Sequence, residues 1–196
     1  KVVQTLTGGV KQLLKKNKVT YIEGEARISK NLKVDVNNET YQAKDIILAT
    51  GSQPFIPPID GLDQVNYETT DTFFDLEKLP KQLAVIGGGV IATELASSMA
   101  DLGVRVTIIE VADDILLTEI NETREMLKAH LENQGIKILT KAKIKQVKES
   151  KIILDGQDDV SFDTLLVAIG RQPNTQVAKD LNLEMDGKFF KVNEHY

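Results

Sequence analysis

The amino-acid sequence predicts an α/β protein with three layers built on a parallel sheet, together with an antiparallel β-meander. An apolar run at 83–86 leads through three consecutive glycines into a helical pattern, and a second apolar run at 104–109 follows that helix directly. A strand, a helix and a further strand in this order form a βαβ unit with parallel strands. The meander is indicated by alternating stretches around 32–36 and 39–42, which Asn37-Asn38 joins as a hairpin turn.

The glycines at 87–89 predict a turn that binds a nucleotide. Gly87 lets the chain leave the strand tightly, Gly89 lets backbone approach a pyrophosphate, and Ala92 is a small residue where the helix packs on the strand. The N-terminus of the helix offers free N–H groups and the positive end of its dipole to the phosphates. Glycine-rich turns also join strands and helices that bind nothing, so the prediction depends on the surrounding sequence.

The residues that follow favour a dinucleotide. The helix predicted at 91–102 carries apolar residues at spacings of three and four and stops at Gly103. Glu110 closes the next strand 110 − 87 = 23 residues after the first glycine, where the acid that binds a ribose is expected in a Rossmann-like fold. The alternative is an acid that merely ends a strand at the surface.

The same stretch favours NAD over NADP. A carboxylate at Glu110 accepts hydrogen bonds from both ribose hydroxyls and would repel a 2′-phosphate. Residues 111–114 contain no arginine that could bind that phosphate. Ala92 in place of a third glycine points slightly the other way, because a bulkier residue there shifts the helix.

Two similar strand ends predict the domain organisation. Residues 45–49 form an apolar run, expected to be a strand buried on both faces, and a near copy at 165–169 ends in Gly170, 170 − 51 = 119 residues after Gly51. Such a pair suits a chain that leaves one nucleotide domain and later returns to it. We therefore predict a partial nucleotide-binding domain at 1–78, an NAD-binding domain at 79–173 and a returning segment at 174–196.

Further elements follow from periodicity and from turn residues. The expected order begins with an amphipathic helix ending near Asn17, a short strand and turn at 19–26, and a helix capped by Asn121 and closed by Gly135. A third parallel strand at 136–139, strands at 144–147, 151–154 and 160–166, and a hairpin at Asp186-Gly187 follow. His130 on the second of these helices is predicted to be a surface residue.

Composition excludes several classes of function. A net charge of −5 gives no reason to propose a nucleic-acid partner, and no apolar run approaches the roughly 18 residues of a membrane helix. The absence of cysteine excludes disulfides, thiolate metal sites and thiol catalysis by the 196 residues present. We expect no metal site, no signal peptide and no catalytic residue in this chain. It opens at Lys1 inside a helical pattern, so we expect a piece of a longer protein.

These motifs resemble the flavoprotein disulfide reductases that carry two dinucleotide-binding domains. The resemblance covers Gly87 to Glu94, Glu110, Ala49 to Ser52 and Ala168 to Asn174. Within this family, residues 6–10, 17–19 and 24–26 are most similar to the dihydrolipoamide dehydrogenases. Mercuric reductases share much of the pattern, including the connector at 56–62, and form the first alternative. A non-catalytic nucleotide-binding module is the second.

The resemblance implies a Rossmann-like FAD/NAD(P)-binding fold and an enzyme that oxidises dihydrolipoamide with FAD and NAD⁺. It also implies that the partial domain at 1–78 is an FAD-binding domain. Its implied NAD contacts are Gly87, Gly88, Gly89, Val90, Ile91, Ala92, Glu94, Glu110, Ile144 and Gly170, and its implied FAD contacts are Thr50, Gly51, Ser52 and Ala26. Glu94 would lie near the nicotinamide; the alternative is an ordinary acid favoured by the helix dipole.

The family's other functional parts have no counterpart in these residues. By resemblance, the FAD pyrophosphate fingerprint and the redox-active cysteine pair would precede Lys1, and the flavin-binding Gly-Asp motif and the catalytic histidine would follow Tyr196; His195 does not match that histidine. The resemblance further implies a cytoplasmic homodimer that meets the lipoyl domain of a 2-oxo acid dehydrogenase complex. We expect the isolated chain to bind NAD weakly and to lack reductase activity.

Overall fold

The computed structural model describes residues 2–29 and 31–194, which divide into two compact units. The central unit comprises Gly51–Asn174, and the terminal unit comprises the residues up to Thr50 together with those from Thr175 onward. Residues 51–78, predicted to belong to a partial FAD-binding domain, pack in the central unit.

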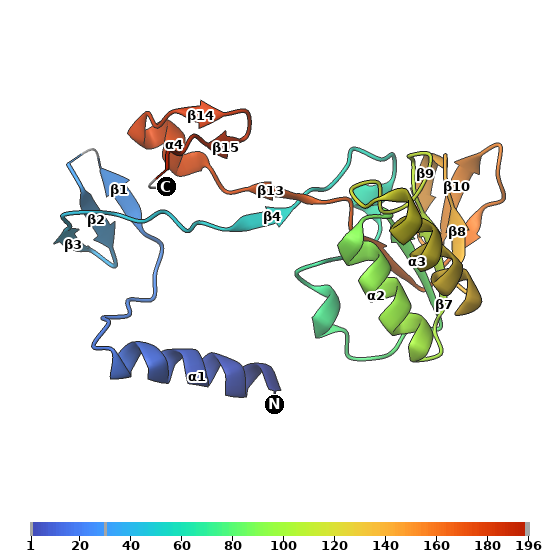
Figure 1. Cartoon of the computed structure of the whole chain (residues 1–196), viewed down its shortest axis with the longest axis horizontal. Helices are drawn as coiled ribbons and strands as arrows, with labels where there is room; N and C mark the ends of the chain where they lie inside the picture. Colours follow the sequence, from blue (N-terminus) through green and yellow to red (C-terminus); the bar gives the residue numbers. More distant parts are fainter. Residues whose placement is uncertain (1, 30, 195–196) are drawn as a thin grey trace. The chain divides into compact units, whose positions relative to one another are not determined.

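The central unit is built on a five-stranded parallel sheet with the strand order β5-β12-β6-β7-β8. Figure 1 labels two of these strands, β7 and β8. The strands are β6 (Gln82–Ile86), β7 (Arg105–Ile109), β8 (Lys137–Leu139), β12 (Thr164–Val167) and the short edge strand β5 (Glu68–Thr69). Helix α2 (Val90–Asp101) connects β6 to β7, and α3 (Asn121–Asn133) connects β7 to β8. The predicted βαβ unit is confirmed.

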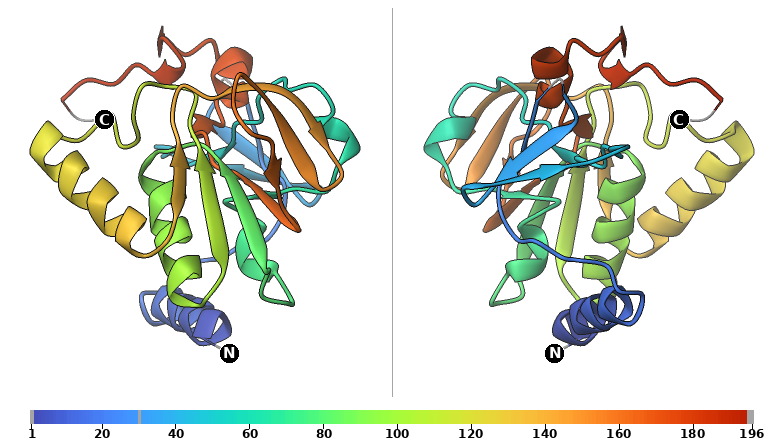
Figure 2. Two further views of the ribbon diagram at one scale, coloured as in Figure 1. Left: turned by 90° about the vertical axis from the view of Figure 1, so that its right-hand side faces the viewer. Right: turned by 90° about the vertical axis from the view of Figure 1, so that its left-hand side faces the viewer.

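Both faces of this sheet are buried, because side chains alternate between two apolar clusters along each strand. Leu83 and Val85 of β6 pack in the cluster beneath α2 and α3, and Ala84 and Ile86 pack in the other cluster. The second cluster also contains an antiparallel sheet of β9 (Lys143–Lys148), β10 (Lys151–Asp155) and β11 (Val160–Ser161). Helices, parallel sheet and antiparallel sheet form the three predicted layers (Figure 2).

The strand predicted at 160–166 is divided into two strands, because the chain changes sheet there. β11 ends at Ser161 and β12 begins at Thr164. Between them, the Asp163 carboxylate accepts hydrogen bonds from the backbone N–H groups of Lys81 (3.0 Å) and Gln82 (3.2 and 3.3 Å). Phe162 is buried in the second apolar cluster. These contacts break the ladder and lead the chain into the parallel sheet.

Two short strands lie where the chain enters and leaves the central unit. β4 (Ser52–Pro54) pairs antiparallel with β13 (Arg171–Pro173), so the two similar motifs seen in the sequence lie side by side. Two 3₁₀ turns, Leu62–Gln64 and Phe73–Asp75, follow β4. The first returns the connector to the antiparallel sheet, where the N–H of Val147 donates to the carbonyl of Asp60 at 2.8 Å.

The terminal unit contains α1 (Val2–Lys16), the meander β1 (Arg27–Ser29), β2 (Lys33–Val36) and β3 (Glu39–Gln42), and the elements α4 (Gln176–Leu181), β14 (Met185–Asp186) and β15 (Phe189–Phe190). The meander is antiparallel, as predicted. Asn37 and Asn38 have φ values of 52° and 64°, the left-handed conformation of a tight hairpin turn. The helix ending near Asn17 and the hairpin at Asp186-Gly187 are also confirmed.

Two predicted strands are absent from this unit, and one predicted helix cap is wrong. Residues 45–49 are irregular and Ile47 is 92% exposed, because no described strand lies beside them to form a ladder or to bury them. Residues 19–26 are likewise not a strand. In the central unit, α3 begins at Asn121 itself without a side-chain cap, since the side-chain Oδ1 of Asn121 accepts a hydrogen bond from Nη2 of Arg124 instead.

No helix in the described part of the chain combines the length and apolarity needed to cross a membrane.

Candidate nucleotide-binding site

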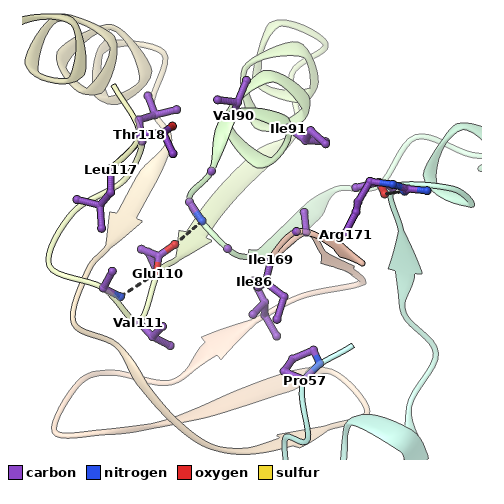
Figure 3. A pocket seen from close by; sticks show the side chains of 18 of the residues that line it. Pro57, Ile86, Val90, Ile91, Glu110, Val111, Leu117, Thr118, Ile169 and Arg171 are labelled. Atoms are coloured by element: carbon purple, nitrogen blue, oxygen red, sulfur yellow. Dashed lines mark hydrogen bonds between the residues drawn. The ribbon is translucent and has the colours of Figure 1, made fainter. Parts of the chain in front are cut away.

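A cleft of about 730 Å³ opens at the carboxyl ends of β6, β7 and β12 in the central unit (Figure 3). In open parallel sheets, ligands bind outside these strand ends. The cleft is lined by the glycine turn, Glu110, the loop after β7, Ile144, and residues 168–171. Its volume lies within the range typical of sites for small molecules and cofactors.

Gly87 is required by the fold of the turn itself. Its φ of 114° lies in a region that residues with a side chain rarely adopt. A Cβ atom at this position would lie 2.4 Å from the carbonyl oxygen of Ala168, at the end of β12. The N–H of Gly87 donates to the carbonyl of Ile109 at 2.9 Å, which keeps the turn next to the end of β7.

Gly88 lies against the loop that follows β7. A Cβ atom there would lie 2.7 Å from Cγ2 of Ile115 and 3.0 Å from Oε2 of Glu110. The N–H of Leu116 donates to the carbonyl of Gly88 at 2.8 Å, so backbone hydrogen bonding also holds the two segments together. The close packing between turn and loop therefore excludes a side chain at Gly88.

Gly89 differs because nothing in the protein requires it to be glycine. Its φ of −78° and ψ of −176° are ordinary extended values, and no protein atom lies within 4 Å of an added Cβ. It is the residue before α2, and no side chain caps the N–H groups of that helix. An open approach to an uncapped helix N-terminus fits the pyrophosphate of a dinucleotide, whose charge those N–H groups and the helix dipole stabilise.

The Glu110 carboxylate is held by two backbone N–H groups beside this turn (Figure 3). Gly88 donates to Oε2 at 2.6 Å and Ala112 donates to Oε1 at 2.7 Å. Each carboxylate oxygen has a second lone pair, so the group can still accept hydrogen bonds from two ribose hydroxyls. The half-buried acid is thus oriented before any ligand binds.

The rim beyond Glu110 carries further acids. Asp114 accepts a hydrogen bond from Nζ of Lys128 on α3 at 2.9 Å, and this bond and its charge lower the pKa of the Asp114 carboxyl. Asp113 is exposed, and its Oδ1 lies 3.6 Å from Nζ of Lys141. On the described part of this rim, Lys128 and Lys141 are each paired with an acid, an arrangement that does not favour a 2′-phosphate.

The structure brings most of the predicted NAD contacts into this one cleft. Those that line it are Gly87, Gly88, Gly89, Val90, Ile91, Glu110, Ile144 and Gly170. Ala92 is fully buried in the cluster beneath α2, consistent with a packing role behind the turn. Glu94 lines a separate groove between α2 and α3, so its place near a nicotinamide stays a prediction.

The predicted FAD contacts are distributed over both units. Thr50 and the exposed Ala26 belong to the terminal unit, and Gly51 and Ser52 belong to the central unit. Their roles stay predictions. Among the described residues, no group of three or more His, Cys, Asp or Glu side chains could hold a metal ion.

Arg171 is a cleft residue that the sequence reasoning did not single out. It lies on β13 beside Gly170, and its guanidinium contacts Ser52, Thr70 and Asp71. The only signal in the sequence was its position directly after the second glycine strand end, which says nothing about its partners. The partners come from segments 100 to 119 residues away in sequence.

Comparison with known proteins agrees with this geometry. The sequence profile described as pyridine nucleotide-disulphide oxidoreductase matches residues 1–196. The chain belongs to this family. Proteins of the family use FAD together with NAD(P), and the Rossmann-like fold and both cofactors were predicted.

The curated relatives include several dihydrolipoyl dehydrogenases. That of Acholeplasma laidlawii is 38% identical over 202 residues, covering 99% of this chain and 60% of the relative. That of Mycoplasma genitalium is 38% identical, covering 94% of this chain and 42% of the relative. A mercuric reductase of Staphylococcus aureus is 34% identical over 85% of this chain and 31% of its own length. The predicted resemblance is confirmed, and the chain spans about 30–60% of these relatives.

Solved structures give the same assignment. The HOCl-induced flavoprotein disulfide reductase RclA of Escherichia coli superposes with a TM-score of 0.80 at 27% identity. The match covers 95% of this chain and 46% of that protein.

Proposed function

We propose that this chain supplies the NAD site of an FAD-dependent dihydrolipoamide dehydrogenase, which oxidises dihydrolipoamide to lipoamide and reduces NAD⁺ to NADH. The observation that carries the proposal is the Glu110 carboxylate, fixed by the N–H groups of Gly88 and Ala112 beside the glycine turn. Similarity to several dihydrolipoyl dehydrogenases over nearly the whole chain supports the choice of substrate.

In this proposal the chain binds and orients the nucleotide. Glu110 accepts hydrogen bonds from the adenosine ribose, and the N–H groups at the start of α2 face the pyrophosphate across the open space at Gly89. The apolar residues Ile144 and Ile169 and the backbone at Gly170 form walls farther along the cleft. NAD⁺ itself supplies the hydride acceptor, and the protein supplies position and electrostatics.

The remaining parts of the proposal concern the whole protein. Thr50, Gly51, Ser52 and Ala26 contact FAD, Glu94 lies near the nicotinamide, and two copies form a cytoplasmic homodimer. The lipoyl domain of a 2-oxo acid dehydrogenase complex delivers the substrate. These assignments rest on family resemblance.

Mercuric reduction is the second candidate, because the mercuric reductase of Staphylococcus aureus is 34% identical over 173 residues. Assays of the full-length protein distinguish the two candidates: one measures reduction of NAD⁺ by dihydrolipoamide, and the other measures reduction of Hg²⁺. The 196-residue chain itself contains no cysteine. We therefore expect no lipoamide turnover from it, and measurable turnover would contradict this reading.

Calorimetric titration of the chain with NADH and NADPH tests the nucleotide site directly. We expect NADH to bind more tightly than NADPH, and Glu110→Gln to weaken NADH binding about ten-fold or more, since hydrogen bonds to a charged group are lost. Asp113→Asn, at an exposed acid three residues away, is the matched control. Equal NADH affinity in the Glu110→Gln variant would refute the proposal.

A further inference from the structure

The Arg171 guanidinium joins three separate segments at one end of the nucleotide cleft. Nε donates to Oγ of Ser52 at 2.8 Å, and Nη2 donates to the Ser52 carbonyl at 2.6 Å. Nη1 donates to Oγ1 of Thr70 at 2.7 Å and to Oδ1 of Asp71 at 2.6 Å, and Nη2 lies 3.4 Å from the other Asp71 oxygen. The group thus connects β13 with β4 and with the loop after β5.

These contacts leave the guanidinium with no donor for a ligand. Arginine has five N–H groups, and the five contacts to Ser52, Thr70 and Asp71 account for all of them. The side chain is 28% exposed, so most of its surface is covered by the segments it joins. A cation in a nucleotide cleft suggests a phosphate ligand, but here the Asp71 carboxylate already neutralises the charge.

The residues held by Arg171 form the wall opposite Glu110. Thr70, Gly170 and Arg171 all line the cleft. Figure 3 shows Glu110 and Arg171 on opposite sides, with Ile86 and Ile169 between them. Gly170 has a φ of 116°, and its carbonyl accepts a hydrogen bond from the N–H of Phe55 at 3.0 Å, so this wall depends on strand pairing between β4 and β13.

We propose that Arg171 is a positioning residue: paired with Asp71, it holds the part of the cleft wall that meets the nicotinamide half of the dinucleotide. This inference rests on the proposed function, in which Glu110 takes the adenosine ribose and α2 faces the pyrophosphate. The other half of an extended dinucleotide then reaches the wall of Thr70 and Gly170. Arg171 keeps that wall in place and makes no contact with the phosphates.

Two ligands separate positioning from general stability. NADH spans the whole cleft, whereas ADP-ribose lacks the nicotinamide. We expect Arg171→Gln and Asp71→Asn each to weaken NADH binding about ten-fold, the cost of a charged hydrogen bond, and to change ADP-ribose affinity less than two-fold. Because the two residues act as a unit, the double variant should bind NADH no more weakly than either single variant.

Conservative and matched variants complete the experiment. Arg171→Lys keeps the charge without the planar fork and should lie between wild type and Arg171→Gln. Arg105→Gln, on the exposed β7 residue away from the cleft, should bind both ligands as wild type does. Thermal unfolding of each variant shows that binding is measured on folded protein; Asp71→Asn, which retains the arginine, serves if Arg171→Gln unfolds.

The outcomes are distinct. Equal losses of NADH and ADP-ribose affinity would show that Arg171 acts on the phosphates or on the whole site, and unchanged NADH affinity would show that it has no binding role; either result overturns the inference. If the wild-type chain bound neither NADH nor ADP-ribose, the proposed nucleotide site itself would be overturned.

Discussion

At the scale of single residues, neighbouring glycines in this turn serve different purposes. The carbonyl of Ala168 leaves no room for a side chain at Gly87, and Ile115 and Glu110 leave none at Gly88. Both glycines are therefore required by packing within the protein. Gly89 faces open space. No contact within the described part of the protein requires its missing side chain, which the proposed function explains by a ligand that approaches the backbone.

This difference predicts opposite phenotypes for two alanine substitutions. Gly87→Ala should lower the free energy of unfolding by about 3 kcal/mol, because the positive φ and the contact with Ala168 both disfavour a Cβ atom. Gly89→Ala should cost only about 0.5 kcal/mol at an uncapped helix start but weaken NADH binding at least ten-fold. Urea denaturation and calorimetry on each variant measure the two effects. A stable Gly87→Ala protein would contradict the account of the turn.

At the scale of elements, the loop after β7 connects the nucleotide cleft to α3. Its Asp114 carboxylate bonds to Nζ of Lys128 on α3 and to the N–H of Ile115. The same loop closes over the glycine turn through Leu116, which adopts a φ of 55° and is buried. The position of α3 and the shape of the cleft rim are therefore connected through one short segment.

The Asp114–Lys128 pair makes a pH-dependent contribution to stability. The hydrogen bond from Lys128 holds the Asp114 pKa below its ordinary value of 3.8 in the folded chain. Its stabilisation is therefore present above about pH 4 and is lost as pH falls through the lowered pKa. Asp114→Asn should cost about 0.5 kcal/mol at pH 7, the magnitude of a half-exposed ion pair, and the difference from wild type should shrink below pH 4.

Urea denaturation across this pH range measures the effect, with Asp113→Asn as the control at a carboxylate that is 85% exposed. A difference between wild type and Asp114→Asn that persists undiminished at pH 3 would show that the ion pair is not its cause.

At the scale of the whole molecule, the cleft lies within one unit of the chain. Every residue that lines it falls between Pro57 and Arg171, inside the central unit at Gly51–Asn174. A ligand that binds only the folded state stabilises the cooperative unit that contains its site. The terminal unit should gain nothing directly from nucleotide binding.

Hydrogen exchange with and without NADH tests this localisation. With NADH at 100 times its Kd, the slow amides of the central unit should exchange about 100-fold more slowly. This factor corresponds to a stabilisation of the folded unit by roughly 2.7 kcal/mol. Amides of the meander at 27–42 should be unaffected. Equal protection of both units would indicate that they unfold together or that the nucleotide also contacts the terminal unit.

Local pattern alone determined much of this protein. Apolar runs ended by Gly87 and Gly170, the helix stopped by Gly103, and Glu110 at the end of the second strand predicted the βαβ unit and its ligand class, because these features depend on residues close in sequence. The predicted βαβ unit is confirmed, because its strands β6 and β7 pair with each other and with the neighbouring strands β12 and β8.

Tertiary structure decided what depends on distant partners. The apolar run at 45–49 is not a strand, because no described strand pairs with it, and 160–166 is divided because Asp163 bonds to the start of β6. The same holds for Arg171, whose role depends on Ser52, Thr70 and Asp71. Periodicity reports how a segment distributes its own side chains, whereas ladder bonds and ion pairs require a second segment that only the folded chain places beside it.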